Sequence, residues 1–204
     1  MTPFEQILQK YRDTSFSERD KGYRFERLMQ SYLKTDPYYA REFTAIWLWN
    51  EFPSRVDFGS GDKDLGIDLV ARTKNGEYWA IQCKFYQEDT TIDKPKVDTF
   101  LSTSGKSFYD TFEVGKKVNF TYRLWIDTTK KGFNAEAEAT IHNQIPQVGR
   151  LGYYDLADAA VDWLKLDEGK KAVVKKYDLK PHQETAISKE RASMLSVNHF
   201  REIA

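Results

Sequence analysis

The chain has 204 residues, of which 40% are hydrophobic and 15% aromatic, enough for one globular domain of ordinary size plus an appendage. Its 31 basic and 31 acidic residues balance, so any surface for a polyanion must be a local patch. One cysteine and three scattered histidines exclude a disulfide framework and a structural zinc cluster of ordinary spacing. The N-terminus is amphipathic and charged rather than a signal peptide, and no apolar run approaches the roughly 20 residues that span a bilayer, so we expect a soluble cytoplasmic protein.

The elements predicted in chain order alternate between helices and strands. Ser17 is a capping candidate for a helix with an apolar stripe, which Pro37 stops. The type of the aromatic segment 43–52 stays open; a loop rich in Gly, Asp and Ser then leads to a β-hairpin over 64–86. Further on we predict a helix over 93–105, a strand over 117–129, a helix over 131–144, a strand over 149–156 and a helix over 157–166. This order predicts an α/β sandwich with a mixed sheet.

The register of the hairpin depends on its turn. A two-residue Asn75–Gly76 turn would set Asp68 against Cys83 and Leu69 against Gln82, so that polar side chains oppose apolar ones. A three-residue loop, 74–76, with Gly76 in the left-handed region, instead places apolar residues opposite apolar ones on one face and the polar residues together on the other. One face then pairs Ile67 with Cys83, Leu69 with Ile81 and Ala71 with Trp79; the other pairs Asp68 with Gln82, Val70 with Ala80 and Gly66 with Lys84. The second register brings Asp68, Gln82 and Lys84 together.

A carboxylate and an ammonium on one face have two interpretations. The first is a solvated salt bridge on an exposed sheet. The second follows if the strand lies inside an α/β sandwich, where charges must be paired or hold a metal. Phosphodiester hydrolysis needs a hard divalent cation on oxygen ligands, and Asp68, the Gln82 amide oxygen and the Cys83 main-chain carbonyl have that chemistry. Lys84 would orient the attacking water or stabilise the pentavalent phosphate.

The motif residues carry a resemblance to a known family. The segments GIDLVART and EYWAIQCKFY resemble the Mrr-like branch of the PD-(D/E)xK nucleases, in which an Asp on one strand is followed by Q-x-K on the next. The segment GYRFERLM is similar to the first-helix pattern of that branch and implies Glu26 as a fourth catalytic residue, beside Asp68, Gln82 and Lys84. The resemblance implies a restriction-endonuclease-like αβα sandwich and a DNA endonuclease that needs Mg²⁺, for which Mn²⁺ substitutes.

A second resemblance rests on two segments, 151–166 and 177–187. The segment LGYYDLADAAVDWLKL is similar to the nuclease domain of single-chain type ISP restriction–modification enzymes, which implies a motor, a methyltransferase and a target recognition domain as partners. The segment YDLKPHQETAI resembles the entrance to superfamily 2 helicase-like ATPases and implies that Gln183 binds ATP, although no G-x-x-x-x-G-K-[ST] loop follows. We expect a nuclease domain over 1–165, then a linker and a truncated motor domain over 166–204.

Loop lysines are the candidates for DNA phosphate contacts. They are Lys106, Lys116, Lys117, Lys130 and Lys131, and Tyr86 and Gln87 are candidates to line the cleft. The predicted activity is nicking of double-stranded DNA without sequence specificity. Two alternatives stay open: a catalytically weak DNA-binding or interaction domain on the same scaffold, and a resolvase that prefers branched DNA.

Overall fold

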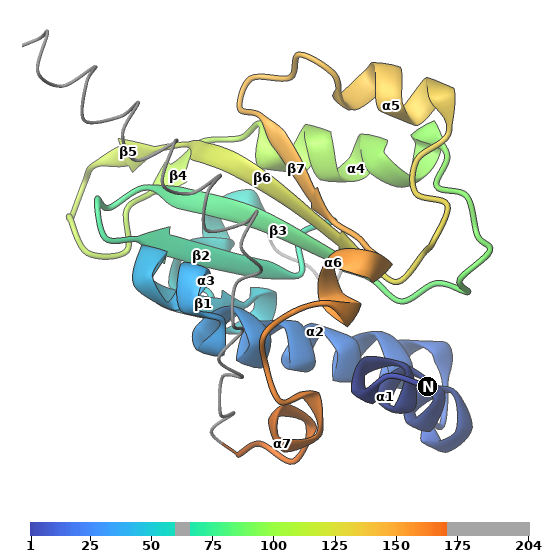
Figure 1. Ribbon diagram of the computed structural model, residues 1–204. Helices are drawn as coiled ribbons and strands as arrows, with labels where there is room; N and C mark the ends of the chain where they lie inside the picture. The colour runs from blue at the N-terminus through green and yellow to red at the C-terminus, as the bar shows by residue number, and fades with distance from the viewer. Residues whose placement is uncertain (60–65, 171–204) are drawn as a thin grey trace, which may run out of the picture. The chain divides into compact units, whose positions relative to one another are not determined.

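The computed structural model describes residues 1–59 and 66–170 (Figure 1). The chain forms two compact units, Met1–Val174 and Lys175–Ala204, and the second lies outside the described residues, as does Gln183. Within the first unit, a five-stranded sheet has the order β1-β2-β3-β6-β7. Its strands are β1 (Phe43–Leu48), β2 (Leu69–Thr73), β3 (Tyr78–Lys84), β6 (Phe120–Asp127) and β7 (Val148–Leu151).

The predicted first core helix is confirmed. It is α2 (Glu18–Thr35), and the Ser17 side chain caps it by accepting a hydrogen bond from the Asp20 N–H at 3.1 Å. The apolar stripe of α2 is buried against the sheet. Helix α2 is preceded by α1 (Pro3–Thr14) and followed by α3 (Pro37–Glu42). Pro37 occupies the first helical position of α3.

The segment after α3, whose type the sequence did not decide, forms a strand followed by two 3₁₀ turns. β1 is followed by η1 (Trp49–Glu51) and η2 (Pro53–Phe58). β1 pairs antiparallel with β2, and β2 pairs antiparallel with β3.

The hairpin has the three-residue loop. Leu69 pairs with Ile81 and Ala71 with Trp79, which is the register predicted for a loop over 74–76. Gly76 has φ +83° and its N–H donates to the Thr73 carbonyl at 3.1 Å. The position of Ile67 differs from the prediction, because it packs with Val70 and Ala80 on the opposite face from Cys83. Since β2 begins only at Leu69, the residue at position 67 does not follow the alternation of the strand.

The second half of the sheet is parallel. β3 pairs parallel with β6, and β6 with β7, so the C-terminal ends of these three strands lie at one edge (Figure 1). Helix α4 (Lys94–Ser104) connects β3 to a small ribbon of β4 (Phe108–Tyr109) and β5 (Lys117–Val118), and α5 (Ala135–Ile141) connects β6 to β7. Asn134 starts α5 by accepting a hydrogen bond from the Ala137 N–H at 2.8 Å, so the helix is shorter than predicted.

The last two predicted elements were partly wrong. Residues 153–156, predicted as strand, begin α6 (Tyr153–Ala157), because the Asp155 carboxylate accepts a hydrogen bond from the Gly152 N–H at 2.8 Å. The predicted helix over 157–166 is divided, and α7 (Trp163–Asp167) starts where the Asp162 side chain accepts from the Lys165 N–H at 3.2 Å.

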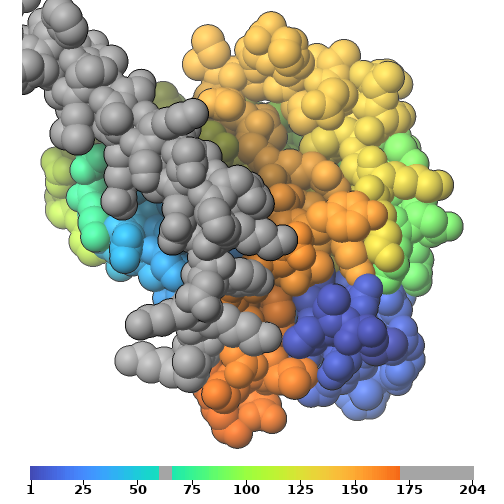
Figure 2. Space-filling view, in the orientation of Figure 1, coloured from blue at the N-terminus to red at the C-terminus, as the bar shows by residue number. Residues whose placement is uncertain are grey.

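The sheet carries a separate apolar core on each face. The core beneath α1, α2, α6 and α7 includes Leu69, Ile81 and Cys83, whereas the core beneath α4 includes Val70 and Ala80. Helices α4 and α5 lie on one side of the sheet, and α1, α2 and α7 lie on the other (Figure 1). The N-terminal helices and the segment after β7 adjoin on the face shown in Figure 2, and α1 contacts both α6 and α7. The predicted αβα sandwich with a mixed sheet is therefore confirmed.

Replacing Gly76 with Val should lower the free energy of unfolding by about 1 kcal/mol or more, because a β-branched residue is strained at positive φ. Urea unfolding of the two proteins measures this change. Lys74→Val is the control in the same loop, where the backbone is not in the left-handed region. An equal effect of the two substitutions would contradict the assigned role of Gly76.

Candidate active site

The end of β3 brings two predicted site residues together. Gln82 and Lys84 are two positions apart, so their side chains leave the same face of the strand. Gln82 is only 2% exposed, and Lys84 is half-buried. With the Gln82 amide in the orientation that satisfies both of its ends, Nε2 donates to the Gly66 carbonyl at 2.8 Å and Oε1 accepts from Lys84 Nζ at 2.7 Å. The amide therefore joins the lysine to the segment before β2.

Asp68 is held against β3 by main-chain and side-chain bonds. Its N–H donates to the Ile81 carbonyl at 2.9 Å, and its carbonyl accepts from the Trp49 N–H at 2.8 Å. Its carboxylate oxygen Oδ2 accepts from the Cys83 N–H at 2.6 Å. The carboxylate is thus bound at the peptide that lies between Gln82 and Lys84 in the sequence.

Gly66 approaches α4 more closely than any other residue type would permit. Its φ is +74°, and a Cβ added there would lie 2.9 Å from the Phe100 main-chain nitrogen. Its carbonyl is the one that accepts from Gln82. A glycine at this position therefore supports both the packing of α4 and the placement of the site.

The pKa of the Cys83 thiol depends on the charges around the end of β3. Burial raises the pKa of Cys83 well above its ordinary value, and the Asp68 and Glu26 carboxylates raise it further, opposed by the Lys84 ammonium. Glu26 comes from α2, on the face of the sheet where Cys83 is buried. The electrostatic influence of Glu26 thus reaches the strand that carries Gln82 and Lys84.

A third carboxylate near the end of β3, that of Asp127, already has hydrogen-bond partners. It ends β6 and pairs with Lys84 in the sheet register, but it is fully buried. The Arg150 guanidinium donates to it through Nε at 2.7 Å and Nη2 at 3.0 Å, and the Thr129 N–H donates at 2.8 Å. This bidentate ion pair fixes the end of β6 and makes Asp127 a structural residue.

A cavity of about 250 Å³ opens beside the motif. It is lined by Gly66, Gln82, Lys84, Tyr86, Lys96 and Thr99. Of the two residues predicted to line the cleft, Tyr86 lines this cavity and Gln87 does not. Lys96 and Thr99 were missed in the sequence, although their spacing of three on the helix after the motif strand places them on one face of α4.

The other predicted lysines do not line this cavity. Lys106 follows the C-terminal end of α4, whereas Lys96 and Thr99 lie in its first half. Lys130 forms an ion pair with Glu88 at 2.6 Å and lies over the Tyr153 ring at 4.5 Å, and Lys131 is exposed. Lys116 is paired with Glu113, and Lys117 is exposed. Their role in DNA binding stays a prediction.

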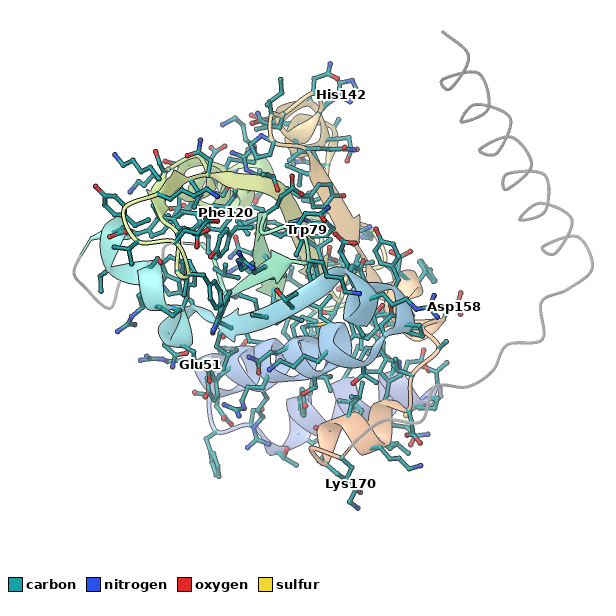
Figure 3. All side chains as sticks on the ribbon, turned by 90° about the vertical axis from the view of Figure 1, so that its left-hand side faces the viewer. Glu51, Trp79, Phe120, His142, Asp158 and Lys170 are labelled. Carbon is teal, nitrogen blue, oxygen red and sulfur yellow. The ribbon has the colours of Figure 1, made fainter. Side chains whose placement is uncertain are left out.

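The oxygen donors at the end of β3 suit a hard cation. Among residues 1–59 and 66–170, no group of three His, Cys, Asp or Glu side chains is placed to hold a metal. His142, the histidine within these ranges, is exposed at the end of α5 (Figure 3). Asp68 and Gln82, together with main-chain carbonyls, are therefore oxygen ligands of the kind that Mg²⁺ accepts.

Comparison with known proteins identifies the family. The sequence model of a restriction endonuclease family matches residues 34–173. Among solved structures, the chain is similar to the ATP-dependent type ISP restriction–modification enzyme LlaBIII bound to DNA, with 30% identity and a TM-score of 0.58 over 87% of this chain but only 10% of that one. The MspJI restriction endonuclease in complex with a 27-mer oligonucleotide matches with 14% identity and a TM-score of 0.45, over 81% of this chain and 32% of that one.

No curated protein matches the chain. No helix in the described part of the chain is both long and apolar enough to cross a membrane. Because the family match covers more than half of the sequence and the sandwich fold agrees with it, the chain belongs to the Mrr-like restriction endonuclease family.

Proposed function

We propose that this chain is the metal-dependent nuclease domain of an ATP-driven restriction–modification enzyme, and that it nicks double-stranded DNA without reading sequence. The observation that carries this proposal is the gathering of Asp68, Gln82 and Lys84 at the end of β3. LlaBIII, described as ATP-dependent and bound to DNA, supports DNA as the substrate. The resemblance of the sequence to type ISP enzymes implies motor, methyltransferase and target recognition domains as partners in a longer polypeptide.

Three oxygen donors would hold the cation: the Asp68 carboxylate, the Gln82 amide and the Cys83 main-chain carbonyl. When bound, Mg²⁺ or Mn²⁺ would supply a nucleophilic water and neutralise phosphate charge. The hydrogen bond from the Cys83 N–H keeps the Asp68 carboxylate on the β3 main chain, beside the other two donors. The residues present therefore fit the predicted divalent cation.

Lys84 and Glu26 would act on the reacting water and phosphate. The Lys84 ammonium already lies 2.7 Å from the Gln82 amide oxygen, so it is held beside a proposed metal ligand. From there it would orient the attacking water or stabilise the charge that develops on the phosphate. Glu26 of α2, which the resemblance implies as a catalytic residue, would orient the attacking water.

A plasmid nicking assay tests the proposal. We expect relaxed circular DNA to form with Mg²⁺ or Mn²⁺ and not with EDTA, slowly for this chain alone because its net charge is zero and its DNA surface is local. The longest native polypeptide should need ATP to cut. Metal-independent nicking, or sequence-specific cleavage by this chain alone, would refute the proposal.

Replacing Lys84 with Gln should slow cleavage about 100-fold or more while raising the Kd for DNA by no more than a few fold, because Lys84 acts mainly on the charge that develops at the scissile phosphate. Single-turnover cleavage separates this effect from binding, which fluorescence anisotropy measures without a divalent cation. Lys74→Gln removes the same charge from the hairpin loop at the opposite end of β3 and should change neither quantity. A parallel loss of affinity and rate on Lys84→Gln would contradict a role in the chemical step.

A further inference from the structure

A second lysine, outside the motif, faces the cavity beside the site. The lining comes from β3 and the segment after it, from Gly66 and from α4, which contributes Lys96 and Thr99. Two ammonium groups, those of Lys84 and Lys96, therefore border one space of about 250 Å³. This volume is several times the roughly 30 Å³ that one water occupies in the liquid, so the cavity can accept a phosphate group.

The Lys96 ammonium is held in place by three neighbours. Nζ lies 5.7 Å from the centre of the Tyr86 ring, an arrangement in which the ring face attracts the cation. It donates to the Thr91 carbonyl at 3.3 Å and lies 3.2 Å from the Asp93 carboxylate. The side chain is 34% exposed, so the ammonium is positioned and still accessible to a ligand from solvent.

The charges around the cavity favour an anion. Of the described residues that line the cavity, two are lysines and none carries a carboxylate, so an anion in the cavity is attracted. Gln82 and Thr99 add polar groups to the lining, and the Gln82 amide is already engaged by Lys84 and Gly66. A phosphodiester has the required charge and several acceptor oxygens for ammonium groups.

We infer that Lys96 is a substrate-positioning residue that binds the DNA phosphate adjacent to the one that is cleaved, with Tyr86 holding its ammonium in place. This inference rests on the proposed nuclease function and assigns to the cavity a backbone subsite outside the motif. Lys84 acts on the scissile phosphate, whereas Lys96 fixes the register of the strand that enters the site. Removing Lys96 should therefore weaken binding and spare the chemical step.

The test compares two lysines of α4 by replacing each with Gln. Lys96→Gln and Lys94→Gln remove the same charge from the same helix, and each lysine is paired with an aspartate, Asp93 for Lys96 and Asp98 for Lys94. Of these two lysines, Lys96 lines the cavity and Lys94 does not. Duplex DNA binding is measured without a divalent cation over a range of salt concentrations, and steady-state nicking is measured with Mg²⁺ on the longest native polypeptide.

We expect Lys96→Gln to raise Kd and KM about 3- to 10-fold, to leave kcat within about twofold and to reduce the salt slope by about 1. Lys96→Arg should restore most of the affinity because it keeps a cation over the Tyr86 ring. If DNA is nicked with a requirement for Lys84, and Lys96→Gln behaves as Lys94→Gln does, this inference is wrong and the proposed function stands. If the unaltered protein neither binds nor nicks DNA, both are overturned.

Discussion

Replacing Asp68 with Asn should lower the cleavage rate by about 10²- to 10³-fold, because removing the negative charge from a metal ligand costs several kcal/mol of transition-state stabilisation. The substitution removes the negative charge of the Asp68 side chain and keeps its shape. The amide oxygen of the introduced asparagine can still accept the hydrogen bond that the Cys83 N–H gives to Asp68, so the hairpin should keep its geometry. Single-turnover nicking with saturating Mg²⁺ measures the rate, and circular dichroism with urea unfolding measures the fold.

The same variant should bind duplex DNA as well as the unaltered protein or better, since a negative charge is removed from the surface that meets phosphates. Asp89→Asn is the matched control, because Asp89 is an exposed carboxylate in the turn after β3 and, unlike Asp68, is not bonded to the Cys83 N–H. Full cleavage by a purified Asp68→Asn protein would rule out Asp68 as a metal ligand. Loss of cleavage with loss of folding would assign it a structural role instead.

Replacing Gly66 with Ala should lower the free energy of unfolding by about 2 to 5 kcal/mol. A φ of +74° costs an alanine about 1–2 kcal/mol, and a methyl group 2.9 Å from the Phe100 nitrogen forces a backbone shift of the overpacking kind, which costs about 1–3 kcal/mol. Nicking should also fall more than tenfold at a temperature where the variant is folded. This follows because α4 and the Gln82 amide both rest on this residue.

Gly22→Ala is the control for this substitution. Gly22 lies inside α2, and a Cβ there would have no neighbour within 4 Å. Helix propensity then predicts that the free energy of unfolding rises by about 0.5–1 kcal/mol, and nicking should be unchanged. Urea unfolding of the two variants should therefore give changes of opposite sign, and a Gly66→Ala protein as stable as the unaltered one would show that α4 does not constrain this position.

Local patterns in the sequence were sufficient for the start of α2 and the register of the hairpin. Ser17 is followed by an apolar repeat of helical period, and the capping bond it makes lies within one turn. The hairpin register depends on the left-handed Gly76 and on the alternation of side chains over a few residues. The same reasoning failed at α6, where a hydrogen bond from Gly152 to Asp155 starts a helix in a segment with strand-like composition.

The proximity of the motif residues followed from the sequence, while their surroundings did not. Asp68, Gln82 and Lys84 are joined by one hairpin, so a period of two residues and a turn type were enough to bring them together. Only the tertiary structure shows that Lys96 and Thr99 line a cavity together with Gln82 and Lys84, that the Glu26 carboxylate raises the pKa of Cys83, and that Asp127 pairs with Arg150. These relations depend on how separate elements dock, and docking is decided by packing between residues far apart in the chain, which no local period encodes.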